Sequence, residues 1–128
     1  MPSTRISTGI WAETRGHEVL EAVQAALVEG LKIPEGDRDV VLDIHGPDRR
    51  IIRATRSDMF TRVEVTLFAG RSLDAKRRLY AALVRNLAAL GVPETEVKTV
   101  LIEVPPENWG LKGGVPASEL DLGFEIRV

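Results

Sequence analysis

Leu31-Lys32-Ile33-Pro34-Glu35 is matched fifty-nine residues further along the chain by Leu90-Gly91-Val92-Pro93-Glu94. The same offset pairs three more identical residues: Val41 with Val100, Leu42 with Leu101, and Pro47 with Pro106. Average composition would give roughly one identity over such a stretch, whereas six are present. The match predicts a single domain over residues 1–128 that is built from two related halves, approximately 2–60 and 61–128.

The first half has the sequence pattern of a strand, a helix and a second strand. Apolar residues recur at helical spacing over residues 17–31, and Thr14 is a candidate cap for this helix. Apolar and polar residues alternate over residues 39–44, which predicts a strand, and residues 4–10 are predicted to form the strand before the helix. We also expect residues 50–55 to form a short extra strand.

The second half repeats this pattern. Residues 63–68 alternate like a strand, and Ser72 with Asp74 suits the amino end of a helix. Leucines recur at helical spacing over residues 79–90, and residues 97–104 form the last predicted strand. A strand, crossover helix and parallel strand form a right-handed unit. Two such units predict an α+β fold, a four-stranded sheet with both helices on one face.

The other face of the predicted sheet has no helix to cover it. Because we expect apolar residues on both faces, this face needs a cover, and another copy of the chain is the simplest one. The fold therefore predicts a homo-oligomer.

The composition excludes several classes of function. A net charge of −2 gives no basic surface for nucleic acid, and no run approaches the roughly 18 apolar residues that span a membrane. There is no cysteine, and the two histidines lack the spacing of zinc ligands. The glycines at 110–114 lack the Gly-Lys-Ser/Thr ending of a phosphate loop. We expect a cytoplasmic protein with neither metal nor cofactor.

Pro2 is the first candidate for chemistry. It becomes the amino terminus if the initiator Met1 is removed, and its nitrogen is then a basic secondary amine instead of an amide. Free α-amino groups titrate near a pKa of ~7.7–8.0, and an apolar pocket or a nearby cation lowers that value. A terminal Pro2 is therefore a candidate general base near neutral pH.

Three motifs accompany Pro2: Gly70-Arg71-Ser72 followed by Lys76, the segment 103–114 with an acidic strand end and an aromatic-glycine turn, and the tail 116–124. Together with the repeated units they resemble the tautomerase superfamily, which includes 4-oxalocrotonate tautomerase. The tail is similar to that of long-chain bacterial members related to malonate semialdehyde decarboxylase.

The resemblance implies the tautomerase fold assembled as a homotrimer, with one pocket at the mouth of each Pro2 and no cofactor. It implies that the proline acts as a general base, or as a general acid in hydrating members. The substrate implied is a small carboxylate, a 2-hydroxydienoate or 2-oxo acid, in which a proton moves between carbon and the enol oxygen.

The resemblance also assigns roles to individual residues. Arg71 is the carboxylate anchor, because a guanidinium grips a carboxylate through two hydrogen bonds. Trp109 is the apolar side chain that excludes water from the amine. Lys98 is a second cation, and Phe124 is a further substrate-binding residue. Each of three residues also has a purely structural alternative. Arg71 could be a solvated arginine in the turn, Trp109 could be part of a subunit interface, and Lys98 could be a solvent-facing lysine of the strand.

Asp37 matches the aspartate that handles water or substrate in the decarboxylase, although it also suits an ordinary turn with Arg38 as its partner. This chain lacks two residues that the resemblance associates with the decarboxylase and the related cis-3-chloroacrylic acid dehalogenase. Phe68 and Ala69 occupy the positions where these enzymes carry a second arginine. The stretch Gln24-Ala25-Ala26 has no counterpart of the dehalogenase's first-helix histidine.

We therefore predict a tautomerase first and a decarboxylase, hydratase or dehalogenase second. If Met1 is retained, the nitrogen of Pro2 is an amide, and a non-catalytic trimeric binding protein becomes the third alternative.

Overall fold

The computed structural model of the chain describes residues 2–123. Its centre is a four-stranded sheet in the order β2-β1-β3-β4. The strands are β1 (Ser3–Thr8), β2 (Val40–Ile44), β3 (Thr61–Phe68) and β4 (Val97–Val104). A small two-stranded sheet, β5 (Gly110–Leu111) with β6 (Val115–Pro116), lies beyond β4 and was not predicted.

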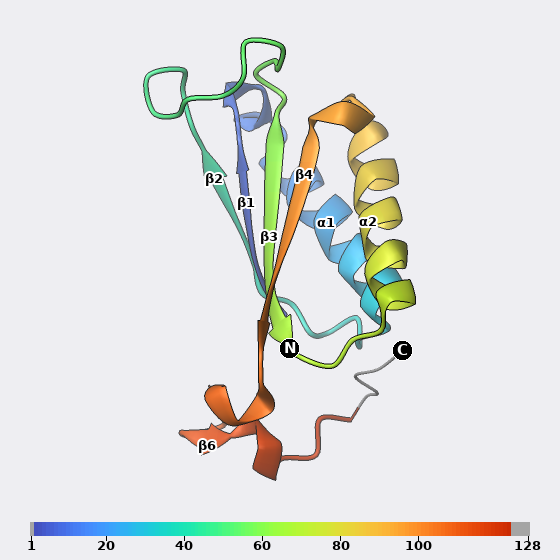
Figure 1. Cartoon of the computed structure of the whole chain (residues 1–128). Helices are drawn as coiled ribbons and strands as arrows, with labels where there is room; N and C mark the ends of the chain where they lie inside the picture. Colours follow the sequence, from blue (N-terminus) through green and yellow to red (C-terminus); the bar gives the residue numbers. More distant parts are fainter. Residues whose placement is uncertain (1, 124–128) are drawn as a thin grey trace.

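Two helices, α1 (Gly16–Leu31) and α2 (Leu73–Ala88), lie side by side on one face of the sheet (Figure 1). β1 is parallel to β2, β3 is parallel to β4, and β1 and β3 pair antiparallel in the centre. Two β-α-β units thus join through their first strands, which confirms the predicted α+β fold.

The core lies between the helices and the sheet, because every second strand residue points toward the helices. Ile6, Val63 and Val65 are fully buried there against Leu27 and Leu83. Close helix packing depends on glycine at one position. A Cβ on Gly30 of α1 would lie 2.5 Å from Cα of Leu79 in α2, so only a residue without a side chain fits.

Three local predictions are wrong. β1 ends at Thr8, and Ile10 begins a short 3-10 turn with 49% of its surface exposed. The carboxylate of Asp58 accepts the backbone N–H groups of Ile10 (3.1 Å) and Trp11 (2.8 Å), so the chain bends away from the sheet. Thr14 does not cap α1, because Arg15 occupies the N-cap position and makes no side-chain cap.

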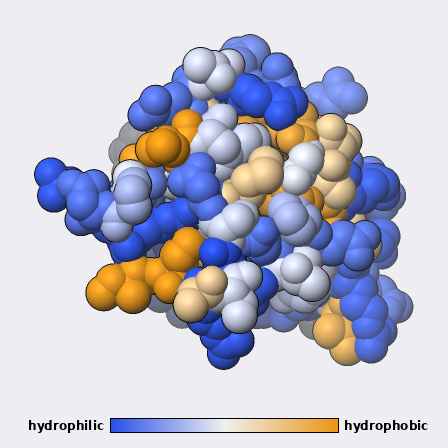
Figure 2. All heavy atoms as spheres, turned by 90° about the horizontal axis from the view of Figure 1, so that it is seen from above, coloured by the Kyte–Doolittle hydropathy of each residue, from blue (hydrophilic) through white to orange (hydrophobic). Residues whose placement is uncertain are grey.

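Residues 50–55 form no strand. They belong to the long β2–β3 connection. Arg50 stabilises this connection by donating hydrogen bonds to the backbone carbonyls of Phe60 and Asp58, each at 2.8 Å. Ile51 is fully exposed in this connection. Viewed from above, the molecule shows separate hydrophobic groups among mostly hydrophilic ones (Figure 2).

The uncovered sheet face differs from the sequence expectation, which took it to be apolar. Its centre is charged: Arg5 pairs with Asp43 at 2.7 Å, and Arg62 pairs with Glu64 at 3.0 Å. Apolar side chains lie toward its two edges, where Val41 of β2 and Ile102 of β4 are 49% and 40% exposed.

Candidate active site

The sheet brings four of the six predicted site residues to one of its ends. β1 starts at this end, while β3 and β4 finish there (Figure 1). Pro2 precedes β1, Arg71 follows β3, and Trp109 follows β4. Asp37 precedes β2, which is parallel to β1 and begins at the same end.

Pro2 is buried, and the pairing of β1 fixes its surroundings. Ser3 faces Thr66 across the antiparallel β1–β3 pair, so one further step places Pro2 opposite Leu67. Strand alternation puts Pro2 on the helix-covered side together with Thr4, which is 2% exposed. The position is shielded from water.

Arg71 is held between the two helices. It is 7% exposed, and its Nη1 donates to the carbonyl of Leu31, the last residue of α1. The next residue, Ser72, caps α2 by accepting the N–H of Ala75 at 3.1 Å. Burial and, to a lesser extent, the positive charge of Arg78 lower the pKa of Arg71 from its ordinary value. A buried cation therefore lies at the Pro2 end of the sheet.

Trp109 packs edge-on against Phe68, with the ring centroids 5.1 Å apart and the ring planes at 63°. Its Nε1 donates to the backbone carbonyl of Val104 at 3.2 Å, which fixes the indole at the end of β4. Phe68 is 1% exposed. Sequence reasoning noted Phe68 only as a missing arginine, whereas the structure shows that it is half of an aromatic pair.

Asp37 lies in the turn that follows α1. Its backbone N–H donates to the carbonyl of Pro34, and its own carbonyl accepts Nε2 of Gln24, both at 3.0 Å. Gln24 is 4% exposed, and sequence reasoning missed its role. The sequence signal that could have indicated this role is a polar side chain at a position of the helix that the structure shows to be buried.

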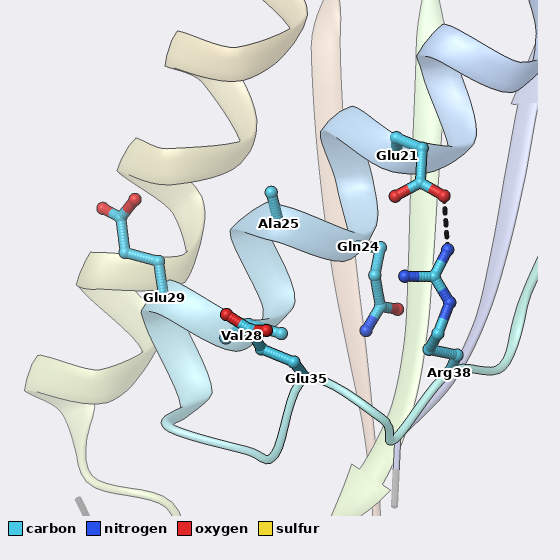
Figure 3. Close-up of a pocket in the computed structure, with 7 residues that line it drawn as sticks. All are labelled: Glu21, Gln24, Ala25, Val28, Glu29, Glu35 and Arg38. Carbon is cyan, nitrogen blue, oxygen red and sulfur yellow. Dashed lines mark hydrogen bonds and ion pairs between the residues drawn. The ribbon is translucent and has the colours of Figure 1, made fainter.

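Arg38, which the sequence offers as a partner for Asp37, pairs with Glu21 of α1 (Figure 3). This pair borders a cavity of about 370 Å³ between α1 and the following turn. The cavity is lined by Glu21, Gln24, Ala25, Val28, Glu29, Glu35 and Arg38. Three carboxylates against one guanidinium make it unsuited to hold a carboxylate substrate.

Lys98 is not brought to Pro2. It is exposed near the start of β4, at the opposite end of the sheet, where it lines a cavity of about 480 Å³ together with Arg53 and Arg56. Phe124, the sixth predicted residue, lies outside the described residues.

Within residues 2–123, no group of three or more His, Cys, Asp or Glu side chains could hold a metal ion. None of the helices in this part of the chain has the length and hydropathy needed to cross a membrane.

A family model described as "Tautomerase enzyme" matches residues 37–112. Among curated proteins, a probable tautomerase of Ralstonia nicotianae is 40% identical over 57 residues, which are 44% of this chain and 80% of that protein. A 2-hydroxymuconate tautomerase of Comamonas testosteroni is 36% identical over 58 residues, 44% of this chain and 90% of that protein. Each relative therefore corresponds in size to about one half of this chain.

Solved structures match nearly the whole chain. The FG41 malonate semialdehyde decarboxylase inhibited by 3-bromopropiolate has a TM-score of 0.81 and 30% identity, and the match covers 92% of this chain and 97% of that one. A symmetric trimer of fused 4-OT has a TM-score of 0.76 and 24% identity, covering 90% and 95% of the two chains. At 24% identity, the likeness to the fused 4-OT structure shows the fold alone.

Proposed function

We propose that this chain, which belongs to the tautomerase enzyme family, is a cofactor-independent tautomerase of small 2-oxo and enol acids. Pro2, exposed as the amino terminus by removal of Met1, is the proposed general base. The observation that carries the proposal is that Pro2, Arg71 and Trp109 all lie at the same end of the sheet. The 2-hydroxymuconate tautomerase relative supports the substrate class.

Each of these residues supplies one requirement of the reaction. The amine of Pro2 takes a proton from the enol oxygen or the carbon of the substrate and returns it at the other position. Arg71 holds the substrate carboxylate and stabilises the negative charge that develops on the enolate. Burial of Pro2 favours the unprotonated amine near neutral pH, and Trp109, packed on Phe68 at the same end of the sheet, is the proposed apolar side of the pocket.

The direct test is an assay of enol–keto conversion with phenylenolpyruvate and 2-hydroxymuconate, using protein whose intact mass shows that Met1 is absent. Conversion above the buffer rate on either compound supports the proposal. Processed protein that converts neither compound would contradict it. A mass that includes Met1 would instead favour the non-catalytic trimeric binding protein.

We also propose that the chain assembles as a homotrimer, as the structural neighbour described as a symmetric trimer does. The exposed apolar residues Val41 and Ile102 on the uncovered sheet face supply contact area for another copy. If assembly covers this face, dilution should dissociate and unfold the protein together, because the free protomer loses that cover. Analytical ultracentrifugation with circular dichroism at falling concentration checks this; a folded monomer at micromolar concentration would contradict it.

A second candidate is a decarboxylase of a 3-oxo acid such as malonate semialdehyde, favoured by the 30% identical decarboxylase neighbour and by the fixed position of Asp37. Against it, the second arginine of that family group is absent, because Phe68 and Ala69 stand in its place.

We expect Asp37→Asn to change enol–keto turnover by less than about threefold, since one anchor and one base suffice for a monoacid. We expect malonate semialdehyde decarboxylation to be slow beside tautomerisation. Steady-state kinetics of both reactions with both proteins decide between the candidates. If decarboxylation is the faster reaction and Asp37→Asn abolishes it, the second candidate is correct.

A further inference from the structure

The connection between β2 and β3, residues 45–60, borders two cavities at the end of the sheet opposite Pro2. The larger cavity has a volume of about 660 Å³ and the smaller one about 480 Å³. Ile51, Ile52 and Arg56 line both, so the two cavities adjoin one another. Figure 2 views the molecule from this end and shows hydrophobic groups beside strongly hydrophilic ones. The proposed reaction at Pro2 uses neither cavity.

The smaller cavity is positively charged. Arg53, Arg56 and Lys98 line it, and none of its other described lining residues is a carboxylate. The guanidinium of Arg56 lies over the ring of Phe60, with Cζ 5.3 Å from the ring centroid. Among residues 2–123, the side chains of these three cations have no hydrogen-bond or ion-pair partner. Three positive charges around one space repel one another, and a bound anion would remove that cost.

The carboxylates nearest to this cluster in the sequence are already engaged. Asp58 accepts the backbone N–H groups of Ile10 and Trp11. Glu96, which is 7% exposed, accepts the backbone N–H of Ser57 and also its hydroxyl, the latter at 2.8 Å. Both carboxylates therefore hold the connection in place and leave the three cations without a counter-charge. A wall that is fixed before a ligand arrives lowers the ordering cost of binding.

The larger cavity is mainly apolar. Ile10, Pro47, Ile51 and Ile52 supply its apolar surface. Its Arg50 already donates to two backbone carbonyls, so it serves the connection itself. Ile51 is fully exposed and Ile10 is 49% exposed, so an apolar group placed here would remove hydrophobic surface from water. An apolar cavity thus adjoins a cationic one.

The internal repeat explains why this end differs from the Pro2 end. The offset of fifty-nine residues pairs Pro2 with Thr61 and Arg71 with Ala12. Thr61 starts β3 at this end, and its nitrogen is an amide without basic character. Ala12 is fully buried and supplies no cation. The counterpart of the Pro2 end therefore has cations of its own for an anion and no base for a proton transfer.

We propose that this end of the sheet is a second, non-catalytic binding site for an organic anion with an apolar body, a phosphate monoester. The phosphate binds among Arg53, Arg56 and Lys98, and the apolar body lies along Ile51 and Ile52 into the larger cavity. A phosphate suits three cations better than a carboxylate does, because it carries more charge and three acceptor oxygens. This site is independent of the proposed function at Pro2.

The test is calorimetry with octyl phosphate on the assembled protein, comparing Arg53→Gln and Arg56→Gln with Arg49→Gln. Arg49 belongs to the same connection, but it pairs with Asp48 at 3.8 Å and lines neither cavity. Circular dichroism and sedimentation establish that each variant is folded and assembled. Since Arg53 is exposed, its replacement tests the site without disturbing the core.

We expect one octyl phosphate per polypeptide, bound more weakly as the salt concentration rises. Arg53→Gln and Arg56→Gln should each weaken binding by roughly threefold to tenfold, the effect of losing one exposed charged contact. Arg49→Gln should change it by less than about twofold. No binding of octyl phosphate, or equal losses for all three variants, would overturn the proposal.

Three further ligands define the chemistry. Octanoate and inorganic phosphate should each bind roughly tenfold more weakly than octyl phosphate, because one lacks the second charge and the other buries no apolar surface. Ile51→Ser should weaken octyl phosphate binding and leave inorganic phosphate unchanged. Vesicles of phosphatidylcholine containing phosphatidate separate a lipid surface from a free ligand. Binding to these vesicles without binding of octyl phosphate would overturn the small-molecule site in favour of a membrane surface.

Arg71→Ala separates this site from the proposed active site. Octyl phosphate binding should survive this replacement, because Arg71 lies at the other end of the sheet. Loss of binding in a folded Arg71→Ala protein would show that octyl phosphate occupies the Pro2 end and would overturn the proposal. If the processed protein converts no enol acid but binds octyl phosphate through Arg53 and Arg56, the second site stands and the tautomerase assignment fails.

Discussion

Replacing Pro2 with alanine should lower enol–keto turnover of the processed protein by roughly a hundredfold or more, the usual contribution of a positioned general base. The reason is chemical, because alanine at the terminus offers a primary amine in place of the constrained secondary amine of proline. Pro2 is buried opposite the end of β3, so the smaller side chain also frees the chain end to move. Steady-state kinetics on phenylenolpyruvate measures the loss.

The matched control is Ser3→Ala, one position into β1, where the side chain is on the other face of the sheet. Ser3→Ala should keep full turnover, and both variants should sediment like the unmodified protein. Intact mass must show Met1 removed in all three proteins. A fully active Pro2→Ala variant would rule out the proline mechanism.

Replacing Arg71 with alanine should lower kcat/KM by roughly a hundredfold or more, because a two-hydrogen-bond contact to a carboxylate is worth a few kcal/mol. The loss should be partly in kcat, since the guanidinium also stabilises charge on the enolate. Arg71→Lys should recover only part of it, because an ammonium cannot reproduce the planar fork.

Arg71 also donates to the carbonyl of Leu31 and so helps to hold the end of α1. Chemical denaturation is therefore measured beside kinetics, and Arg77→Ala, an exposed arginine of α2, is the control for lost positive charge. An Arg71→Ala protein that is folded and retains its kcat/KM would exclude Arg71 as the anchor. Equal losses for Arg71→Ala and Arg77→Ala would point to net charge instead of a specific contact.

The regular elements could be predicted because periodicity in the sequence reports burial. The helices appear within two residues of their predicted starts and ends where leucine and valine recur, and Val97–Val104 is the strand expected. The strand predicted over residues 4–10 forms as Ser3–Thr8 and ends two residues early, and the strand predicted over residues 50–55 does not form. The early end of β1 has a physical reason. A carboxylate distant in sequence, that of Asp58, takes the backbone N–H groups of Ile10 and Trp11, and no local pattern reveals such a partner.

The candidate site was predictable where it depends on strand direction. Pro2, Asp37, Arg71 and Trp109 all border the sheet end that the two units share by topology. Lys98 lies near the start of β4, at the other end of the sheet from Pro2, and its role as a second cation stays a prediction. Two contacts could not be predicted: that of Gln24 with the turn and that of Trp109 with Phe68. They depend on how side chains pack in three dimensions, which the pattern of a single sequence does not reveal.

The antiparallel pairing of β1 with β3 has a consequence for how many reaction centres each polypeptide can have. The two units run in opposite directions, so the start of the second unit lies at the far end of the sheet from Pro2. Thr61 begins that unit inside the chain, so its nitrogen is an amide. Its hydroxyl shares a hydrogen bond of 2.9 Å with the hydroxyl of Thr8. Joining two units in one polypeptide thus leaves one amino terminus for both, so the proposed proline mechanism predicts one reaction centre per polypeptide.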